Sequence, residues 1–386
     1  MKILHIISSG GMYGAEAVIL NTSRTLNRGG HTSLLGIFSN SARPNLELHE
    51  CAHREGIESH LISCRGQADT GVPARIRALA LSTGADVIHA HGYKADVYCY
   101  LAMRRSSIAL ISTCHNWLDD TRLVTTYGIL DRWILRRYAA VIAVSEEVKK
   151  RLIVSGISPH KISLIRNGID LRPFEAAHPS LREHAHTPSD LLVGWIGRLS
   201  PEKGPDLFVR AASRVHAQLP LVRFLLVGEG PGREEIERLI AELGLVEVVD
   251  LAGRRSDMPA VYASFDLMVS SSRREGLPMA VLEGMATGLP WVATSVGDVP
   301  TIIQDGRTGL VVPSEDVNGM AEATTRLLQN REERAQMGAA ARALVEREYS
   351  SERMTAEYLG VYLRAAAVKG QERESGIEHA TSGRSH

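Results

Sequence analysis

The chain has 386 residues, which is long for one hydrophobic core and predicts two domains of ordinary size. Its 44% hydrophobic and 23% charged content is typical of a globular protein, and no apolar run reaches the roughly eighteen residues that cross a bilayer. The net charge of zero argues against general nucleic-acid binding, and four scattered cysteines without C-x2-C spacing predict neither structural zinc nor a disulfide framework.

Residues 1–170 alternate apolar, strand-like runs with helical patterns, which predicts a mostly parallel sheet covered on both faces. Since the first run is too short for a secretion signal and leads into a glycine loop, we expect a strand there and a cytoplasmic location. Basic residues outnumber acidic ones in this half. The predicted strands are Ile3–Ile7, Ser33–Phe38, Asp86–Ala90, Ala109–Ser112, Val141–Val144 and Ile162–Ile165.

The loop after the first strand contains Gly10, Gly11 and Gly14, which would let the backbone approach a ligand near a helix N-terminus. A dinucleotide-binding loop is the rival interpretation. It is disfavoured because the spacing is G-G-x-x-G rather than G-x-G-x-x-G, and because the second strand ends in Ser39-Asn40 without the expected acidic residue.

Histidines follow two later strands of this half. His89 and His91 alternate at the end of one strand, but no carboxylate stands near at ligand spacing, so we interpret them as structural or acceptor-proximal rather than as metal ligands. His115, followed by Asn116, comes directly after the next strand. Because open α/β sheets bind ligands at the carboxyl ends of their strands, His115 is the main candidate site residue of this half.

The segment 121–138 has apolar residues at helical spacing, with Arg132, Arg136 and Arg137 on other faces. An ordinary amphipathic helix packed on the sheet is the simpler interpretation. The alternative is a basic, Trp-bearing surface that rests on anionic lipid headgroups, which would give the protein a peripheral contact with the inner face of the cytoplasmic membrane.

The second half repeats the alternation after a Pro- and His-rich connection at 171–189. This pattern predicts a second doubly wound domain at 190–350, followed by a helix at 351–368 and a polar, disordered tail at 369–386. Its predicted strands are Leu191–Ile196, Val222–Val227, Val246–Leu251, Leu267–Ser270, Trp291–Thr294 and Gly309–Val312.

Two carboxylates in one loop–helix segment, Glu275 and Glu283, have seven residues between them. Gly276 permits a sharp turn and Pro278 suits the first position of a helix, so Glu275 falls in the loop and Glu283 in the second helical turn. The free amides at this helix start, with the helix dipole, would favour an anion such as a phosphate. Two further glycine-bearing loops, 197–204 and 228–232, also join a strand-like run to a helical pattern.

Taken together, these motifs resemble glycosyltransferase family 4, whose retaining enzymes have the GT-B fold and take sugars from nucleotide diphosphates. The resemblance runs from about Ile3 to Leu363 and implies an α/β protein of two Rossmann-like domains, N-terminal 1–170 and C-terminal 190–350, facing a cleft. A C-terminal helix would cross back onto the first domain. The landmarks are the E-x7-E pair Glu275 and Glu283, Arg198 with Lys203, the 228–231 turn, Gly253-Arg254, the 167–170 segment and the early glycine loop.

The resemblance also implies roles for single residues. Arg198 and Lys203 would neutralise the diphosphate, in place of a metal ion, since the sequence contains no D-x-D motif. Glu283 would hold the ribose, and Glu275 the hydroxyls of the transferred sugar. The remaining donor-binding positions would be Gly11, Gly253, Arg254, Gly276, Leu277 and Pro278, and the acceptor side would use His91, His115 and Asn116, with His115 joining Glu275, Arg198 and Lys203 as catalytic residues.

The expected reaction is metal-independent, retaining hexosyl transfer to a glycan or lipid-linked acceptor in bacterial surface polysaccharide synthesis. No cofactor is implied; the donor is expected to be a UDP-sugar, with a GDP-sugar as the alternative. Two rivals share the fold, a nucleotide-sugar 2-epimerase and a phosphorylase, and a catalytically silent binding protein is a third class. The phosphorylase is disfavoured because only two lysines follow Asp170.

Overall fold

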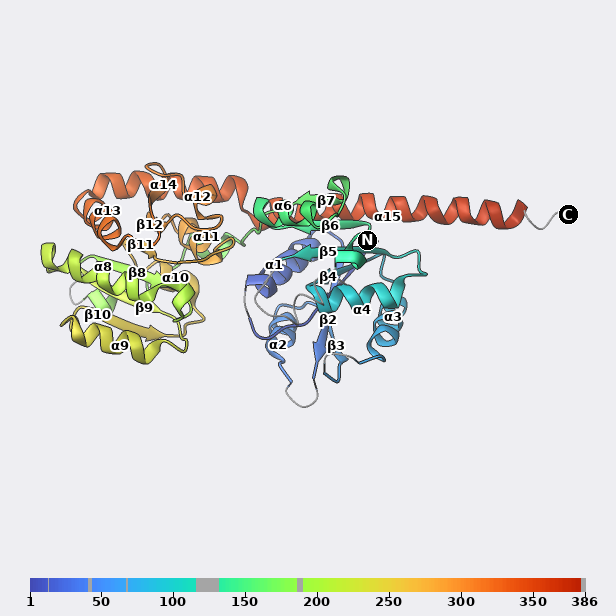
Figure 1. Ribbon diagram of the computed structural model, residues 1–386, viewed down its shortest axis with the longest axis horizontal. Coiled ribbons are helices and arrows are strands. Elements are labelled where there is room, and N and C mark those ends of the chain that lie inside the picture. Colours follow the sequence, from blue (N-terminus) through green and yellow to red (C-terminus); the bar gives the residue numbers. More distant parts are fainter. Residues whose placement is uncertain (13, 41–43, 67–68, 116–131, 186–189, 383–386) are drawn as a thin grey trace. The chain divides into compact units, whose positions relative to one another are not determined.

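The computed structural model describes residues 1–382, except for 13, 41–43, 67–68, 116–131 and 186–189 (Figure 1). The chain divides into two compact units, each with its own sheet. Unit 1 consists of Met1–Gly168 with Ser351–His386, and unit 2 consists of Ile169–Ser350. The C-terminal helix thus belongs to the same unit as the N-terminus.

Unit 1 is built on a seven-stranded parallel sheet of order β3-β2-β1-β4-β5-β6-β7. Its strands are β1 (Lys2–Ile7), β2 (Thr32–Ser39), β3 (Ser59–Ser63), β4 (Val87–His91), β5 (Ala109–Cys114), β6 (Ala140–Ala143) and β7 (Ile162–Leu164). Its helices are α1 (Gly14–Arg28), α2 (Glu47–Arg54), α3 (Val72–Thr83), α4 (Tyr93–Met103), α6 (Glu146–Val154), η1 (Pro159–Lys161) and α15 (Ser351–Ser382).

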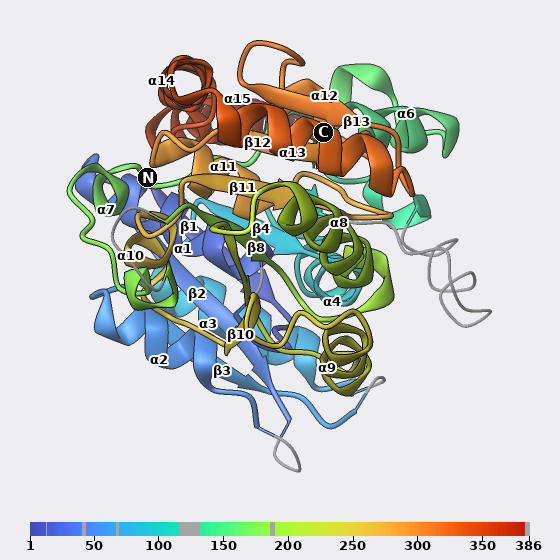
Figure 2. The same cartoon turned by 90° about the vertical axis from the view of Figure 1, so that its left-hand side faces the viewer.

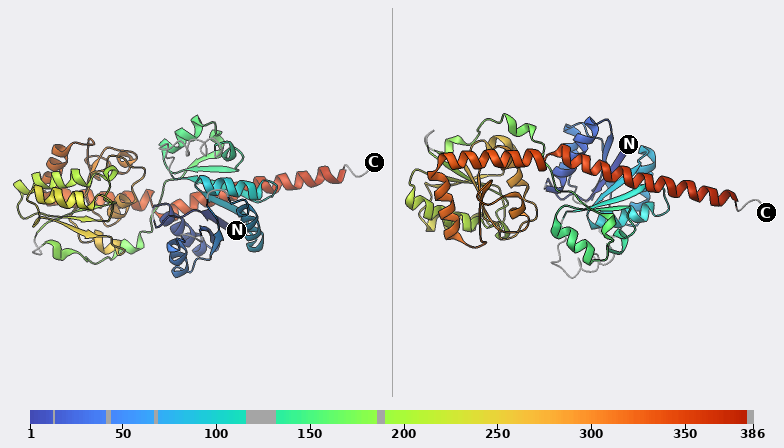
Figure 3. Two further views of the ribbon diagram at one scale, coloured as in Figure 1. Left: turned by 60° about the horizontal axis from the view of Figure 1, so that its bottom comes forward. Right: turned by 90° about the horizontal axis from the view of Figure 1, so that it is seen from above.

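The two faces of this sheet have different neighbours, because successive strand side chains point to opposite sides. Leu4 and Ile6 of β1 join the core that contains Ile76 of α3 and Cys99 of α4. The alternate residues of β1 point to the other face, where α15 packs against α1 and β5. Figure 3 shows α15, in red, running alongside unit 1. The structure therefore covers both faces, as the strand–helix alternation predicts.

Unit 2 has a six-stranded parallel sheet of order β10-β9-β8-β11-β12-β13. Its strands are β8 (Leu192–Ile196), β9 (Arg223–Val227), β10 (Val249–Gly253), β11 (Leu267–Ser270), β12 (Trp291–Thr294) and β13 (Gly309–Val312). Its helices are α7 (Arg172–Glu175), η2 (Arg182–Ala185), η3 (Pro201–Lys203), α8 (Pro205–Gln218), α9 (Arg233–Glu242), α10 (Met258–Tyr262), α11 (Met279–Ala286), α12 (Val299–Ile302), α13 (Val317–Gln329) and α14 (Arg331–Glu348).

Two separate cores lie on the two faces of the second sheet. Val193 and Phe224 pack with α8, α9 and α13, whereas Leu192 and Leu225 pack with α10, α11 and α14. Figure 2 shows α8 and α9 together on one side of this sheet. Unit 2 is therefore doubly wound, and its loops at the carboxyl ends of β8, β9, β10 and β11 lie along one edge.

The structure differs from the sequence predictions at a few segments. The edge strand β3 is missed because it buries only one fully covered residue, Ile62, and alternates with polar side chains. Residues of the expected connection 171–189 include α7 and η2, and Arg182 forms an ion pair of 2.7 Å with Asp266 of unit 2. Helix α15 continues to Ser382, whereas a disordered tail is expected from Lys369, since 369–382 contains strong helix formers and no proline.

The segment 116–131, which holds Asn116 and most of the expected basic helix, lies outside the described residues. Beyond that segment, the Arg137 guanidinium carbon lies 3.3 Å from the centroid of the Trp133 ring, and Trp133 is exposed. In the part of the chain that is described, no helix has the length and apolar character needed to span a bilayer.

Candidate functional site

Two glycine-containing loops of unit 2, 197–204 and 228–232, are in backbone contact at the edge of the sheet. The Leu199 amide donates to the Glu229 carbonyl at 3.1 Å, and the Gly232 amide donates to the Leu199 carbonyl at 2.9 Å. A Cβ on Gly228 would lie 1.8 Å from the Gly197 carbonyl oxygen, and one on Gly230 would lie 2.4 Å from that of Leu199. Only glycine fits at both places, so the 228–232 turn fixes the shape of the 197–204 loop.

The cation of that loop meets the first carboxylate of the E-x7-E segment. Lys203 Nζ lies 2.6 and 2.7 Å from the two carboxylate oxygens of Glu275, and Ser272 Oγ donates to the same group at 2.7 Å. The Glu275 side chain is only 8% exposed, whereas that of Lys203 is 31% exposed. The pair is therefore a largely buried carboxylate that orients a partly exposed ammonium, with one ammonium proton left for a ligand.

Arg273 connects the 197–204 loop to the segment that contains Glu275. Its guanidinium binds both carboxylate oxygens of Asp206 at 2.7 and 2.8 Å, and it donates to the Pro201 carbonyl at 3.0 Å and to Glu315 at 2.5 Å. These contacts raise the pKa of Arg273, chiefly through the hydrogen bonds to Asp206, so it stays charged. No sequence pattern predicts a role for Arg273, since an arginine beside a loop has no characteristic spacing.

Helix α11 begins at Met279, shortly after Glu275, with Pro278 at its N-cap. Among the described residues, no group accepts a hydrogen bond from the amides of Leu277, Met279 or Ala280. These amides and the helix dipole give a partial positive charge beside the Lys203–Glu275 pair. The arrangement is suited to an anion.

Glu283 lies in the second turn of α11, where Tyr262 donates a hydrogen bond to its carboxylate at 3.1 Å. Burial raises the pKa of Glu283 to about 7, and the Tyr262 hydrogen bond opposes that rise. A carboxyl group that titrates near neutrality, with one oxygen held by a phenol, can accept from or donate to ligand hydroxyls.

The other predicted donor residues lie on the neighbouring loops of the same edge. Gly253 ends β10, and its carbonyl accepts from the Gly228 amide at 2.9 Å; Arg254 follows it and is exposed. Arg198 is also exposed, and no described group pairs with its guanidinium. The Gly276 carbonyl accepts from the Asp298 amide at 3.2 Å. The structure thus brings Lys203, Glu275, Gly276, Leu277 and Pro278 together, with Gly253 joined through Gly228.

The predicted residues of unit 1 lie at the carboxyl edge of its sheet. Gly11 is buried after β1, with φ of +152°, and its amide donates to Ser9 Oγ at 3.3 Å. His91 ends β4 and His115 follows β5; His91 Nδ1 and His115 Nε2 are 3.1 Å apart, within one hydrogen bond. Asn116 lies outside the described residues.

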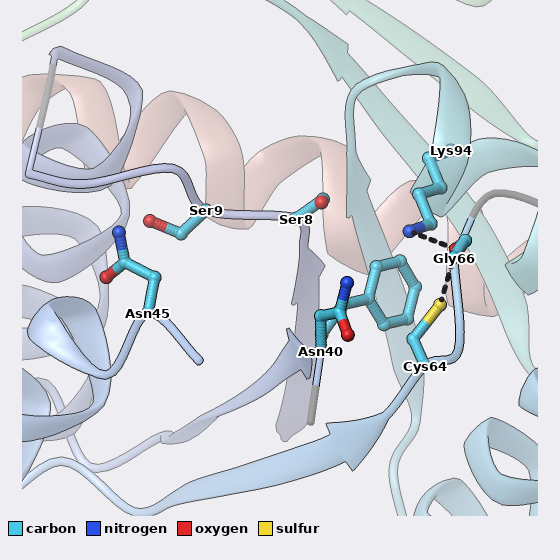
Figure 4. Close-up of a pocket in the computed structure, with 8 residues that line it drawn as sticks. Ser8, Ser9, Asn40, Asn45, Cys64, Gly66 and Lys94 are labelled. Atoms are coloured by element: carbon cyan, nitrogen blue, oxygen red, sulfur yellow. Dashed lines mark hydrogen bonds between the residues drawn. The ribbon is translucent and has the colours of Figure 1, made fainter. Parts of the chain in front are cut away.

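A polar pocket of about 270 Å³ occupies the same edge of unit 1 (Figure 4). Lys94 donates to the Gly66 carbonyl at 3.1 Å and lies over the Phe38 ring, and Cys64 Sγ donates to the same carbonyl at 3.3 Å. The ammonium retains two further protons. The sequence analysis did not single out this pocket, which is lined by Ser8, Ser9, Phe38, Asn40, Asn45, Cys64, Gly66 and Lys94.

Comparison with known families gives a match for each half of the chain. Residues 12–172 match the family described as Glycosyltransferase Family 4, and residues 190–330 match the one described as Glycosyl transferases group 1. The chain belongs to glycosyltransferase family 4. It has the GT-B fold, as the E-x7-E resemblance implies.

Curated relatives of this glycosyltransferase act on different acceptors. It is 28% identical over 267 residues to D-inositol 3-phosphate glycosyltransferase of Mycobacterium marinum, a match that covers 64% of this chain and 56% of the relative. It is 27% identical over 362 residues to N-acetyl-alpha-D-glucosaminyl L-malate synthase of Bacillus anthracis, covering 90% of this chain and 93% of that one. The chain thus spans little more than half of the mycobacterial relative.

Solved structures have the same fold at low sequence identity. HepE of Anabaena, solved in complex with UDP, aligns with a TM-score of 0.81 at 22% identity, covering 93% of this chain and 99% of that one. Its complex with UDP-glucose aligns with a TM-score of 0.79 at 24% identity, with the same coverage. These likenesses establish the fold of the family 4 enzyme described here.

Proposed function

We propose that this glycosyltransferase moves a hexosyl group from a UDP-sugar on unit 2 to a hydroxyl of an acceptor on unit 1, without a metal ion and with retention of configuration. The observation that carries the proposal is the Lys203–Glu275 pair beside the open amides of α11. A diphosphate leaving group gains negative charge as the glycosidic bond breaks, and a fixed cation with preorganised N–H groups stabilises that charge.

In this proposal, the residues of unit 2 divide the donor among them. Lys203 and Arg198 bind the diphosphate with the α11 amides, Glu275 accepts from hydroxyls of the transferred sugar, and Glu283 holds the ribose. Gly253 and Arg254 border the base. UDP is favoured over GDP because HepE, which shares this fold, was solved with UDP and with UDP-glucose.

In this proposal, unit 1 supplies the acceptor side through His91, His115 and Asn116, and Gly11 contributes to donor binding. The proposed acceptor is a glycan or lipid-linked sugar of bacterial surface polysaccharide synthesis, and the fold shared with an outer-core galactosyltransferase, WaaB, at a TM-score of 0.71 supports it. A lipid-linked acceptor would bring the basic surface at Arg132, Arg136 and Arg137 to anionic headgroups.

A small anionic acceptor is the second candidate, and the Lys94 pocket favours it. The relatives named above act on inositol 3-phosphate and L-malate, both of which carry negative charge. A pocket of about 270 Å³ with one ammonium and several hydroxyl and amide groups would hold one phosphate or carboxylate group with a few hydroxyls.

Donor binding provides the first experiment. The purified enzyme is titrated calorimetrically with UDP-, GDP- and ADP-glucose in EDTA, and then incubated with the bound donor and a panel of lipid-linked, glycan and small anionic acceptors. We expect UDP-sugar binding in EDTA and a product with the donor's anomeric configuration by NMR. Epimerised sugar formed without acceptor would favour the 2-epimerase, and donor binding that requires a divalent ion would overturn the metal-independent proposal.

Membrane contact is tested separately by flotation with liposomes that contain anionic lipid. The wild type is expected to float and an Arg132/Arg136/Arg137-to-Ala variant to remain in the soluble fraction. If both remain in the soluble fraction, the peripheral contact is removed from the proposal.

A further inference from the structure

A row of histidines crosses three neighbouring strands of unit 1. His5 Nδ1 lies 3.0 Å from His91 Nε2, and His91 Nδ1 lies 3.1 Å from His115 Nε2. Each distance fits one N–H···N hydrogen bond. The three side chains therefore form a chain that starts in the interior at β1 and ends at the candidate catalytic residue.

The inner part of this chain is buried. His5 and His91 are 1% and 6% exposed, whereas His115 at the outer end is half-buried. Burial lowers the pKa of His5 to about 3 and that of His115 to about 4, and it lowers that of His91 well below its ordinary value, with the neighbouring histidines adding to the effect. All three rings are neutral at physiological pH, so each carries one proton on one of its two nitrogens.

A fourth histidine, His89, lies beside His5 and His91. His89 Nδ1 bonds the Tyr362 hydroxyl at 2.7 Å, and His89 Nε2 bonds Thr113 Oγ1 at 2.7 Å. Ligand atoms of His5, His89 and His91 lie within 4.8 Å of one another, as in a metal site. Two observations argue against a zinc ion here. Tetrahedral ligand atoms about 2.0 to 2.1 Å from zinc lie farther apart than the 3.0 Å between His5 Nδ1 and His91 Nε2. A metal bound to His89 would also displace one of the hydrogen-bond partners of His89.

The inner end of the row decides the direction of its hydrogen bonds. His5 Nε2 is buried, and no residue that the structure describes forms a hydrogen bond with it. If His5 Nε2 carried the proton, a buried N–H group would be left without an acceptor. If Nε2 carries no proton, the unsatisfied group is only a lone pair. A buried N–H group without an acceptor is rarer and costs more free energy than a buried lone pair without a donor. His5 therefore carries its proton on Nδ1 and donates it to His91.

Each later ring follows from the one before it, because a neutral imidazole that accepts at one nitrogen donates from the other. His91 accepts at Nε2 and must donate from Nδ1 to His115 Nε2. His115 in turn keeps its proton on Nδ1, and no described residue accepts from that nitrogen.

We propose that His5 and His91 are positioning residues which hold His115 as the Nδ1–H tautomer, so that His115 offers substrate a hydrogen-bond donor rather than a base. The ligand group it meets is then an oxygen acceptor, such as a sugar hydroxyl or a phosphate oxygen. The tautomer follows from the chain itself, whereas the meeting with substrate rests on the proposed function.

The tautomer is measured directly by two-bond 15N–1H correlation NMR on full-length enzyme labelled with 15N-histidine. His115 is assigned from the signal lost in a His115→Gln variant. We expect Nδ1 of His115 to be protonated and Nε2 to be bare. A protonated Nε2, or an equal mixture of the two forms, would overturn the proposal.

Two substitutions of His91 test the positioning. In His91→Asn the side-chain amide nitrogen takes the place of Nδ1 and can still donate to His115, whereas His91→Leu cannot. We expect the Asn variant to retain the Nδ1–H form of His115 and to have a higher kcat than the Leu variant. We expect the Leu variant to lose the fixed tautomer and about tenfold in kcat, the size of one hydrogen bond of about 1.4 kcal/mol.

Controls separate this proposal from a folding defect and from the proposed function. Exposed His53→Asn is the matched control, and melting temperature is recorded for each variant. If His91→Leu does not fold, the wild-type spectrum and His91→Asn still decide the tautomer. If the spectra show the expected tautomer but no transfer is found, the proposed function fails while the histidine chain stands. An unchanged His115 tautomer in a folded His91→Leu variant would refute the positioning role.

Discussion

The two central side chains of unit 2 are partners that lie far apart in sequence. Lys203 and Glu275 are 72 residues apart, yet both carboxylate oxygens contact the ammonium. A lysine held in this way presents a fixed charge and loses less conformational entropy on binding a ligand than a free one. Substitutions at Lys203 and Glu275 are therefore expected to change donor use.

Replacing either partner is expected to weaken transfer. Lys203→Ala removes the cation, and Glu275→Ala removes both a proposed sugar ligand and the group that orients Lys203. We expect each to lower kcat/KM at least about tenfold, equivalent to one charged hydrogen bond of about 1.5 to 3 kcal/mol. Arg342→Ala, which breaks an exposed ion pair with Glu346, is the control. Full activity of either variant would remove the assignment.

Glu283 links stability to pH through its raised pKa of about 7. The protonated Glu283 carboxyl contributes its full stabilisation to the folded state below the ordinary carboxyl pKa near 4.5. This stabilisation is lost as pH rises through about 7, because the buried carboxyl must then ionise. Glu283→Gln stays neutral. We expect its free energy of unfolding, relative to wild type, to rise by about 2 kcal/mol between pH 5 and 8, measured by urea denaturation. The same difference at both pH values would contradict a raised pKa.

At the scale of elements, the donor edge depends on two loops held at backbone contact distance. The 228–232 turn and the 197–204 loop approach so closely that side chains are excluded at Gly228 and Gly230. Arg273 then ties the 197–204 loop to the segment before α11. The loops thus act as one rigid platform for Lys203 and the α11 amides.

Gly230→Ala tests this platform without adding backbone strain, because the φ angle of Gly230 is not positive. Its new Cβ would lie 2.4 Å from the Leu199 carbonyl oxygen and must displace the loop. We expect a loss of more than about 2 kcal/mol in stability and a weaker affinity for UDP, measured by calorimetry. In the control Gly244→Ala the Cβ meets nothing within 4 Å but φ is +68°, so only strain of about 1 to 2 kcal/mol applies and UDP affinity should be unchanged.

On the scale of the whole molecule, the chain returns to its first unit at its end. Helix α15 packs on α1 and β5, and its Tyr358 and Tyr362 are 1% and 0% exposed. Tyr362 bonds His89 in the interior of unit 1. Unit 1 therefore has a core that residues 1–168 cannot complete alone.

Truncation tests this dependence. A chain that stops after Ser350 is expected to leave unit 1 unfolded or aggregated, because it exposes the face that α15 covers. A chain that stops after Val368 keeps both tyrosines, and its melting temperature should stay within about 2 °C of the full-length protein. Near-ultraviolet circular dichroism and calorimetry record both. A cooperative transition for unit 1 in the shorter chain would show that α15 is dispensable.

The sequence by itself determined the strand–helix alternation, all but one of the strands, and the family, because these depend on local periodicity and on motifs read within one segment. Only the tertiary structure decided which segments meet. The strand order β1-β4-β5 aligns His5, His91 and His115, and the loop contacts pair Lys203 with Glu275. Edge strand β3 stayed hidden because it buries only Ile62 among polar side chains. Arg273 stayed hidden because its role comes from neighbours that are distant in the chain, and no local pattern encodes such neighbours.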